Sequence, residues 1–130
     1  MAPTDTEKVS MNMNVVDLGH IDLLVDQGFY TGRTDFLRTA IRNLLTTHSD
    51  TLKQAVAREY MVVGVLSFGR KALERTLAKG EKLDLRVVGV LTLGNDVTPE
   101  LARQAIRSVK VQGAFRASQD VKDALNDVTE

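Results

Sequence analysis

One short segment near the amino terminus constrains the fold of this 130-residue chain more than any other. From Lys8 to Asn14 polar and apolar side chains alternate strictly, in the order KVSMNMN, with valine and methionine at every second position. This alternation predicts one short β-strand with a single buried face. Residues with helical spacing follow directly, so the strand has no partner within its own segment.

Two helices are predicted after this strand. Asn14 is suited to cap the first, because its side chain can accept a hydrogen bond from a free amide of the first turn. Apolar residues at helical spacing extend this helix to Gln27, and Gly28 suits the left-handed position that ends it. The second helix is predicted to start between Thr31 and Thr34 and to end near Thr47.

A unit of one strand and two helices is too small to bury a core by itself. A second copy resolves this, because two strands can pair antiparallel across a twofold axis with four helices packed beneath them. The sequence therefore predicts a homodimer. Its shared core is predicted to contain the apolar residues of the strand and of both helices, Val9, Met11, Met13, Ile21, Phe36, Ile41 and Leu44.

Residues 8–47 resemble the ribbon-helix-helix DNA-binding domain of the Arc, MetJ and CopG type. The resemblance rests on the alternating strand KVSMNMN, on the helix that ends at Gly28, and on the segment GFYTGRTDFLRTAIRNLL. That last segment is similar to the family pattern G-x-Y-x-x-R-S-E-x-I-R-x-A-[IL]-R. Thr34 and Asp35 stand where the pattern has Ser and Glu, and both replacements are chemically mild.

The resemblance implies that the paired strands insert as a ribbon into the major groove of double-stranded DNA. If the apolar positions face the core, the base contacts come from the outward side chains, Lys8, Ser10 and Asn12. The resemblance also implies phosphate contacts at the amino terminus of the second helix, by Gly32, Arg33 and Thr34. The alternative is that these positions form an ordinary solvated surface.

Composition excludes several other classes of protein. The chain has 17 basic and 17 acidic residues, and residues 1–53 carry five basic against seven acidic side chains, so DNA binding must depend on a few local charges. It has no cysteine and only two histidines, so we expect no metal site, no cofactor and no enzyme activity. No apolar run is long enough to cross a bilayer, and a cytoplasmic location is expected.

The second half of the chain has its own pattern. The pentapeptide VVGVL occurs at residues 62–66 and again at 87–91, and a degenerate version, VQGAF, occurs at 111–115. We interpret these as three apolar strands in stacked strand-plus-turn units with a repeat of about 25 residues. Three unrelated strands in a small α/β domain are the alternative. A strand-rich domain over residues 59–125 is thus predicted.

The predicted fold class is α+β, a ribbon-helix-helix dimer followed by this strand-rich α/β domain. Residues 1–7 are expected to form a flexible arm, residues 48–58 a helical connector, and residues 126–130 a tail. The predicted function is a sequence-specific DNA-binding transcriptional regulator, acting as a repressor. Its second half would join dimers into a higher oligomer, or bind an effector or a protein partner.

An antitoxin-like or scaffold interaction protein is the alternative function. In that case the C-terminal repeats would bind a partner or self-assemble. An antitoxin of this fold has a disordered partner-binding tail, whereas residues 59–125 have the apolar content of a folded domain. This content favours a regulator or a scaffold.

Overall fold

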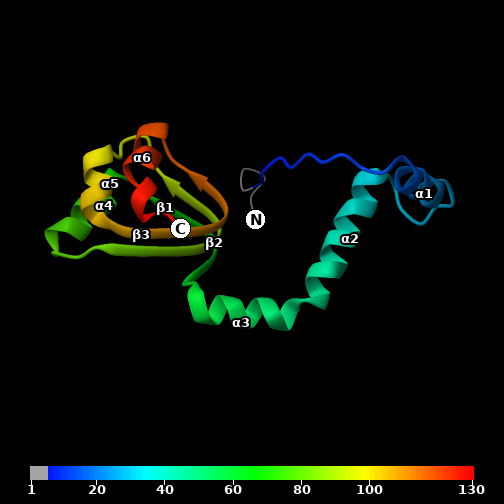
Figure 1. Cartoon of the computed structure of the whole chain (residues 1–130), viewed down its shortest axis with the longest axis horizontal. Coiled ribbons are helices and arrows are strands. Elements are labelled where there is room, and N and C mark those ends of the chain that lie inside the picture. Colours follow the sequence, from blue (N-terminus) through cyan, green and yellow to red (C-terminus); the bar gives the residue numbers. More distant parts are fainter. Residues whose placement is uncertain (1–5) are drawn as a thin grey trace. The chain divides into compact units, whose positions relative to one another are not determined.

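The computed structural model describes residues 6–130, which form two compact units. The N-terminal unit is Lys8–Gln54, and the C-terminal unit is Ala55–Glu130 together with Thr6 and Glu7. The chain is drawn in sequence colours in Figure 1. Of the arm expected over residues 1–7, residues 1–5 lie outside the described part.

The N-terminal unit contains helices α1 (Val15–Asp26) and α2 (Arg33–Thr47), and helix α3 (Ser49–Glu59) begins within it. The side chain of Asn14 accepts hydrogen bonds from the amides of Val16 and Asp17, at 2.8 and 3.3 Å, so the predicted cap is confirmed. Gly28 has a φ of 86°, which confirms the left-handed turn predicted after α1. Helix α3 occupies the segment expected to be a helical connector.

The strand predicted over residues 8–14 is not formed in the single chain. This part of the prediction is wrong for one copy, because these residues have no regular secondary structure. The physical reason is that a β-strand is completed by hydrogen bonds to a neighbouring strand. No other strand is found in the N-terminal unit, so a single copy cannot supply those hydrogen bonds.

The C-terminal unit is a three-stranded parallel sheet with helices between the strands. Strands β1 (Val62–Phe68), β2 (Leu83–Leu93) and β3 (Ile106–Arg116) lie in that order. Helix α4 (Arg70–Ala78) joins β1 to β2, and α5 (Pro99–Ala105) joins β2 to β3. The short helices α6 (Gln119–Ala124) and η2 (Asn126–Val128) follow β3. Parallel neighbours need such crossover connections.

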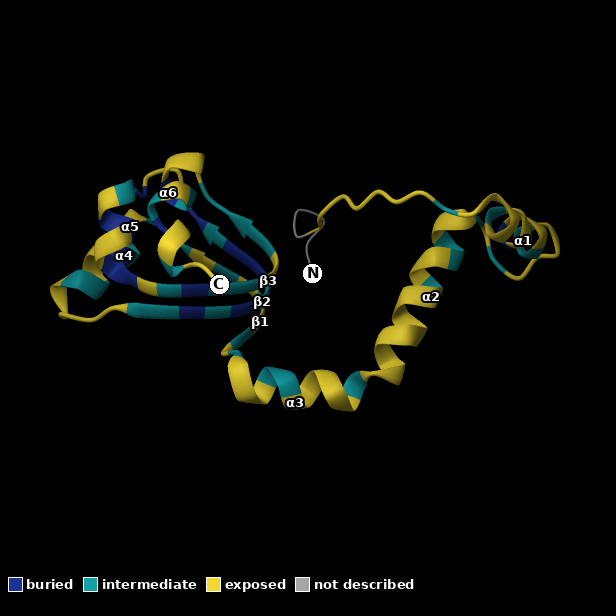
Figure 2. Cartoon of the chain, viewed as in Figure 1, coloured by how far each residue is buried: buried dark blue, intermediate teal, exposed yellow. Residues whose placement is uncertain are grey.

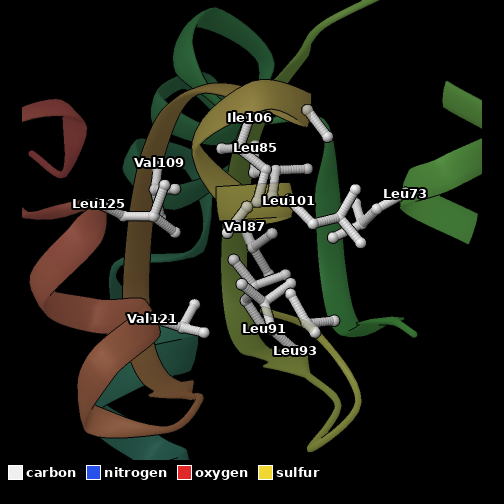
Figure 3. Packing of buried hydrophobic residues seen from close by; sticks show 13 residues of the cluster. Leu73, Leu85, Val87, Leu91, Leu93, Leu101, Ile106, Val109, Val121 and Leu125 are labelled. Carbon is white, nitrogen blue, oxygen red and sulfur yellow. The ribbon is translucent and has the colours of Figure 1, made fainter. Parts of the chain in front are cut away.

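The core of this unit lies between one face of the sheet and helices α4, α5 and α6 (Figure 2). Leu73 of α4 and Val121 of α6 belong to one buried cluster with odd-numbered residues of β2, which include Val87 and Leu91 (Figure 3). Because successive side chains of a strand alternate between faces, the even-numbered residues of β2 lie on the opposite face of the sheet. The helices therefore cover one face of the sheet and leave the other without a layer of its own.

Identical pentapeptides are aligned in this sheet. Val62–Leu66 pairs in register with Val87–Leu91, and Gly64, Gly89 and Gly113 form one row across the three strands. The predicted stacked strand-plus-turn units are not seen, because the connections contain helices and the strands form a single sheet. The chain buries its strands by covering one face with these helices instead of stacking one turn on the next.

The row of glycines marks a close approach between neighbouring backbones. Gly89 has a φ of 132°, and a Cβ atom placed on it would lie 2.0 Å from the carbonyl oxygen of Gly64. The same holds for Gly113, whose Cβ would lie 2.1 Å from the carbonyl oxygen of Gly89. Only glycine fits at these two positions, since any other residue would collide with main-chain atoms that cannot rotate away.

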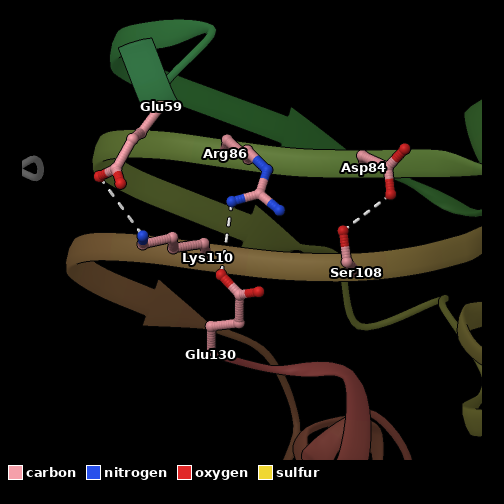
Figure 4. A network of polar contacts seen from close by, with 6 residues as sticks. All are labelled: Glu59, Asp84, Arg86, Ser108, Lys110 and Glu130. Carbon is pink, nitrogen blue, oxygen red and sulfur yellow. Dashed lines mark hydrogen bonds and ion pairs between the residues drawn. The ribbon is translucent and has the colours of Figure 1, made fainter. Parts of the chain in front are cut away.

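Polar contacts join the amino-terminal ends of β2 and β3 to neighbouring segments (Figure 4). The ammonium group of Lys110 lies 3.5 Å from Glu59, and Arg86 lies 3.4 Å from Glu130. The main-chain amide of Glu130 also donates a hydrogen bond to the carbonyl oxygen of Val109, at 2.8 Å. Residues 126–130, expected to be a tail, therefore lie along β3.

Candidate nucleic-acid interface

Residues 8–14 present two kinds of side chain in alternation. The polar positions Lys8, Ser10 and Asn12 are exposed. Val9 and Met11 are also exposed in the single chain, with 85% and 75% of their surface accessible. Apolar side chains left this open indicate a surface that another group of atoms covers.

A hollow of about 400 Å³ shows which side of this segment faces the helices. Residues from the segment, α1 and α2 line it: Met11, Met13, Asp17, His20, Ile21, Leu24, Phe36 and Leu37. Met11 and Met13 line it, whereas Ser10 and Asn12 do not. In one copy, two of the three apolar residues of this segment therefore face the helices.

The N-terminal unit does not bury a core in one copy. Ile21 is the one fully buried hydrophobic residue among residues 8–54, all of which are described. Phe36 is half-buried and packs edge-to-face against Tyr30, with 5.1 Å between the ring centres. Ile41 and Leu44, which are predicted core residues, are exposed on α2. Of the seven predicted core residues, the structure brings Met11, Met13, Ile21 and Phe36 together around the hollow.

The amino terminus of α2 has an open set of main-chain amides. Its N-cap residue is Gly32, and no side chain caps this end of the helix. Asp35 instead accepts a hydrogen bond from the amide of Thr31, at 2.9 Å. Helix amino termini attract anions, because their first amides have no partner within the helix. The predicted phosphate contacts Gly32, Arg33 and Thr34 all lie at this end of α2.

The side chain of Arg33 is already engaged within the N-terminal unit. Its Nε and Nη2 atoms each donate a hydrogen bond to the carboxylate of Asp22 on α1, both at 2.8 Å. The hydrogen bond from Arg33 holds the pKa of Asp22 below its usual value, and the same bond raises the pKa of Arg33. This two-bond pair joins α1 to the start of α2 and leaves both side chains about half exposed.

Sequence reasoning identified Arg33 and missed Asp22. The acid is one of several aspartates on the outer side of α1, and nothing in its spacing distinguishes it. The intervening turn brings it to Arg33, which lies 11 residues later. The one signal available in the sequence is that an acidic residue and an arginine lie on opposite sides of the predicted turn.

The described residues offer no sign of a metal centre or a membrane segment. Within residues 6–130, no group of three or more histidine or acidic side chains is placed to hold a metal ion. No helix in that part of the chain is long and apolar enough to span a bilayer.

Comparison with known proteins gives one match. A family model described as "Ribbon-Helix-Helix transcriptional regulator family" matches residues 4–122, which include the C-terminal unit up to α6. Neither the curated proteins nor the solved structures contain a significant match. The matched residues span most of the chain and extend well beyond the segment whose motif resembles ribbon-helix-helix domains. The chain therefore belongs to the ribbon-helix-helix transcriptional regulator family.

Proposed function

We propose that this protein is a sequence-specific DNA-binding transcriptional repressor that works as a dimer. Residues 8–14 of two copies pair antiparallel and enter the major groove, which is wide enough for a two-stranded ribbon. Lys8 contacts guanine acceptors, Asn12 bridges an adenine, and Ser10 serves either base. Membership of a family of transcriptional regulators supports this proposal.

One observation supports the assignment of the base-reading side chains more than any other. Met11 and Met13 line the hollow against α1 and α2, whereas Lys8, Ser10 and Asn12 do not. A strand that buries its methionines against the helices must present the three polar side chains on the other side. The alternation that forms the dimer core therefore also directs the base-reading residues outward.

We assign the sequence-independent part of the binding to the start of α2. The amides at Gly32, Arg33 and Thr34 would receive a DNA phosphate, and the Arg33 guanidinium would add a charge beside it. Such contacts fix the position of the protein on the duplex and read no bases. They also allow a chain with no net charge to bind DNA, because a few cations at the right place suffice.

The exposed apolar residues of the N-terminal unit support the dimer. Val9 and Met11 of the segment, together with Ile41 and Leu44 of α2, would be covered by the same residues of a second copy. The C-terminal unit would in turn join dimers into a higher oligomer. This unit has a buried core that includes α6, which favours a regulator or scaffold over an antitoxin with a disordered tail.

A gel-shift experiment with fragmented genomic DNA and excess competitor tests the proposal. We expect a small set of fragments to be retained by the full chain. Binding of every fragment with equal affinity would contradict sequence-specific regulation, and absence of any shift would favour the scaffold alternative.

The phosphate contact is tested on the retained fragments. In a plot of the logarithm of the binding constant against the logarithm of the salt concentration, Arg33→Ala should reduce the slope by about one unit for each phosphate that is no longer bound. Arg75→Ala, an exposed arginine of α4, is the matched control.

A further inference from the structure

The edge of the sheet at β1 is open and apolar. Met61 and Val63 have 75% and 67% of their surface exposed, and Val65 is also exposed. From Met61 to Gly69 the chain has no charged residue and no proline. Natural sheets protect their edges with charges, prolines or covering segments, because an open edge pairs readily with another strand. By sequence, β1 has neither charge nor proline.

The two edges of this sheet differ. On β3, the outer side at Val109 is covered by the end of the chain, since Thr129 forms a parallel bridge with Val109 and Glu130 donates a hydrogen bond to it. Lys110, the next residue of β3, is charged and lies within 3.5 Å of Glu59. The chain thus protects the outer side of β3 with its own C-terminus. No residue of β1 itself is charged.

We propose that the β1 edge pairs with the β1 edge of a second copy of this chain, antiparallel and across a twofold axis, to make one continuous six-stranded sheet. The inference rests on the proposed self-association of the C-terminal unit, and it specifies the surface. The pairing completes the open edge and brings the Val63 and Val65 side chains of the two copies side by side on the uncovered face of the sheet. A twofold pairing uses one edge of each C-terminal unit, so two such pairings join two of the proposed dimers into a closed particle of four chains.

Charge argues for a second copy as the occupant. Across a twofold axis the strand meets itself in the reverse direction, so a charge near the axis would lie beside its own copy and repel it. An uncharged strand avoids this repulsion. DNA is a poor fit to the same surface, because phosphates require cations and residues 61–69 have none.

Cysteine crosslinking tests the pairing directly, because the natural chain has no cysteine. Val63→Cys, Val65→Cys and Ser67→Cys place single thiols along β1, to be oxidised with diamide alone and in mixed pairs. Antiparallel neighbours have Cα atoms about 4.5–5.5 Å apart, which lies within the range that a disulfide spans. The matched control is Gln112→Cys, since Gln112 is exposed and lies in the same row as Val63 but on β3.

We expect at least one β1 variant or mixture to form a crosslinked dimer rapidly, and the Gln112 variant to remain uncrosslinked. Absence of any crosslink faster than that of Gln112→Cys would overturn the proposal. A strand from a different protein as the natural occupant would give this same negative result with the purified chain.

Added charge gives a second and independent test. Val65→Lys in the full chain should reduce the sedimenting mass to that of a dimer, whereas Gln112→Lys should leave it unchanged. Cooperative thermal unfolding of each variant shows whether the C-terminal unit is still folded. An unchanged mass for folded Val65→Lys would overturn the proposal. Gel shifts of the same samples report on DNA binding separately, so failure of edge pairing and failure of DNA binding are distinguished.

Discussion

The guanidinium of Arg33 donates two hydrogen bonds of 2.8 Å to the carboxylate of Asp22. The residue that we assign to a DNA phosphate is thus held by an acid of α1 in the absence of DNA. A phosphate and a carboxylate offer the same kind of paired oxygen acceptors to arginine, so the two compete for one side chain. Asp22 is therefore expected to weaken DNA binding while it orders the turn between α1 and α2.

Asp22→Asn should strengthen binding to all DNA sequences alike, by severalfold, because Arg33 is released and a negative charge is removed. Asp26→Asn is the control, since Asp26 is exposed on the same helix and forms no ion pair among the described residues. Titration of labelled duplexes with each variant near neutral pH measures the two DNA-binding affinities. Equal gains in the two variants would show that charge alone acts and that Asp22 does not compete for Arg33.

The pH of that titration matters. Because Arg33 lowers the pKa of Asp22, the carboxylate is charged at neutral pH and the pair is intact. Any stability from the pair is present at higher pH and is lost as the pH falls through the lowered pKa. The effect of Asp22→Asn should accordingly disappear only in acid.

Asn12→Ala should cost roughly 1–3 kcal/mol of discrimination for each base that the side chain no longer reads. The fold should be unaffected, because the side chain of Asn12 is exposed and Met11 and Met13 still face the helices. Competition between a retained fragment and random duplex DNA measures the ratio of the two binding affinities. Asn126→Ala in the C-terminal unit is the control. Unfolding of the dimer by Asn12→Ala would mean that the alternation is displaced by one residue.

Ile41→Asp tests whether a second copy covers α2. In one chain Ile41 is exposed, so the change would be harmless to a monomer. In the proposed dimer it places an unpaired charge in the shared core, so it should break that interface with loss of helix and leave at most pairs of chains joined at β1. Sedimentation and circular dichroism check both effects. Arg42→Asp, at the next position of α2, should retain the dimer; equal behaviour of the two variants would argue against this interface.

Gly89→Ala should unfold the C-terminal unit or cost at least about 4 kcal/mol, because the new methyl group meets the carbonyl oxygen of Gly64. Gly64→Ala is the matched control. Gly64 has nearly the same φ, 134°, but open space where the methyl group would lie. It should therefore cost less, about 1–3 kcal/mol, from the strained backbone alone. Similar thermal unfolding of both variants would contradict the close approach of β1 and β2.

Local signals in the sequence predicted local features of the fold. The cap at Asn14, the turn at Gly28 and the strands that contain the repeated pentapeptides are all present in the structure. Each depends on neighbouring residues alone, so its pattern could be recognised in the chain. The family assignment also followed from such a pattern, the alternation and the GFYTGRTDFLRTAIRNLL segment.

Features that depend on distant residues were not predictable in this way. The strands form one parallel sheet with helices as crossovers, whereas the repeat of about 25 residues was interpreted as stacked strand-plus-turn units. The pair between Asp22 and Arg33 arises only once the turn has folded. The ribbon is absent from the single chain because its partner strand would belong to another copy.

Chemical protection of the bases tests the central claim most directly. Dimethyl sulfate methylates guanine N7 in the major groove and adenine N3 in the minor groove, so it reports which groove the protein occupies. On a retained fragment, we expect the full chain to protect guanine N7 atoms at two positions related by a twofold axis, and Asn12→Ala to alter the protection near the base that Asn12 contacts. Protection of adenine N3 alone, with every guanine N7 still reactive, would contradict a ribbon in the major groove.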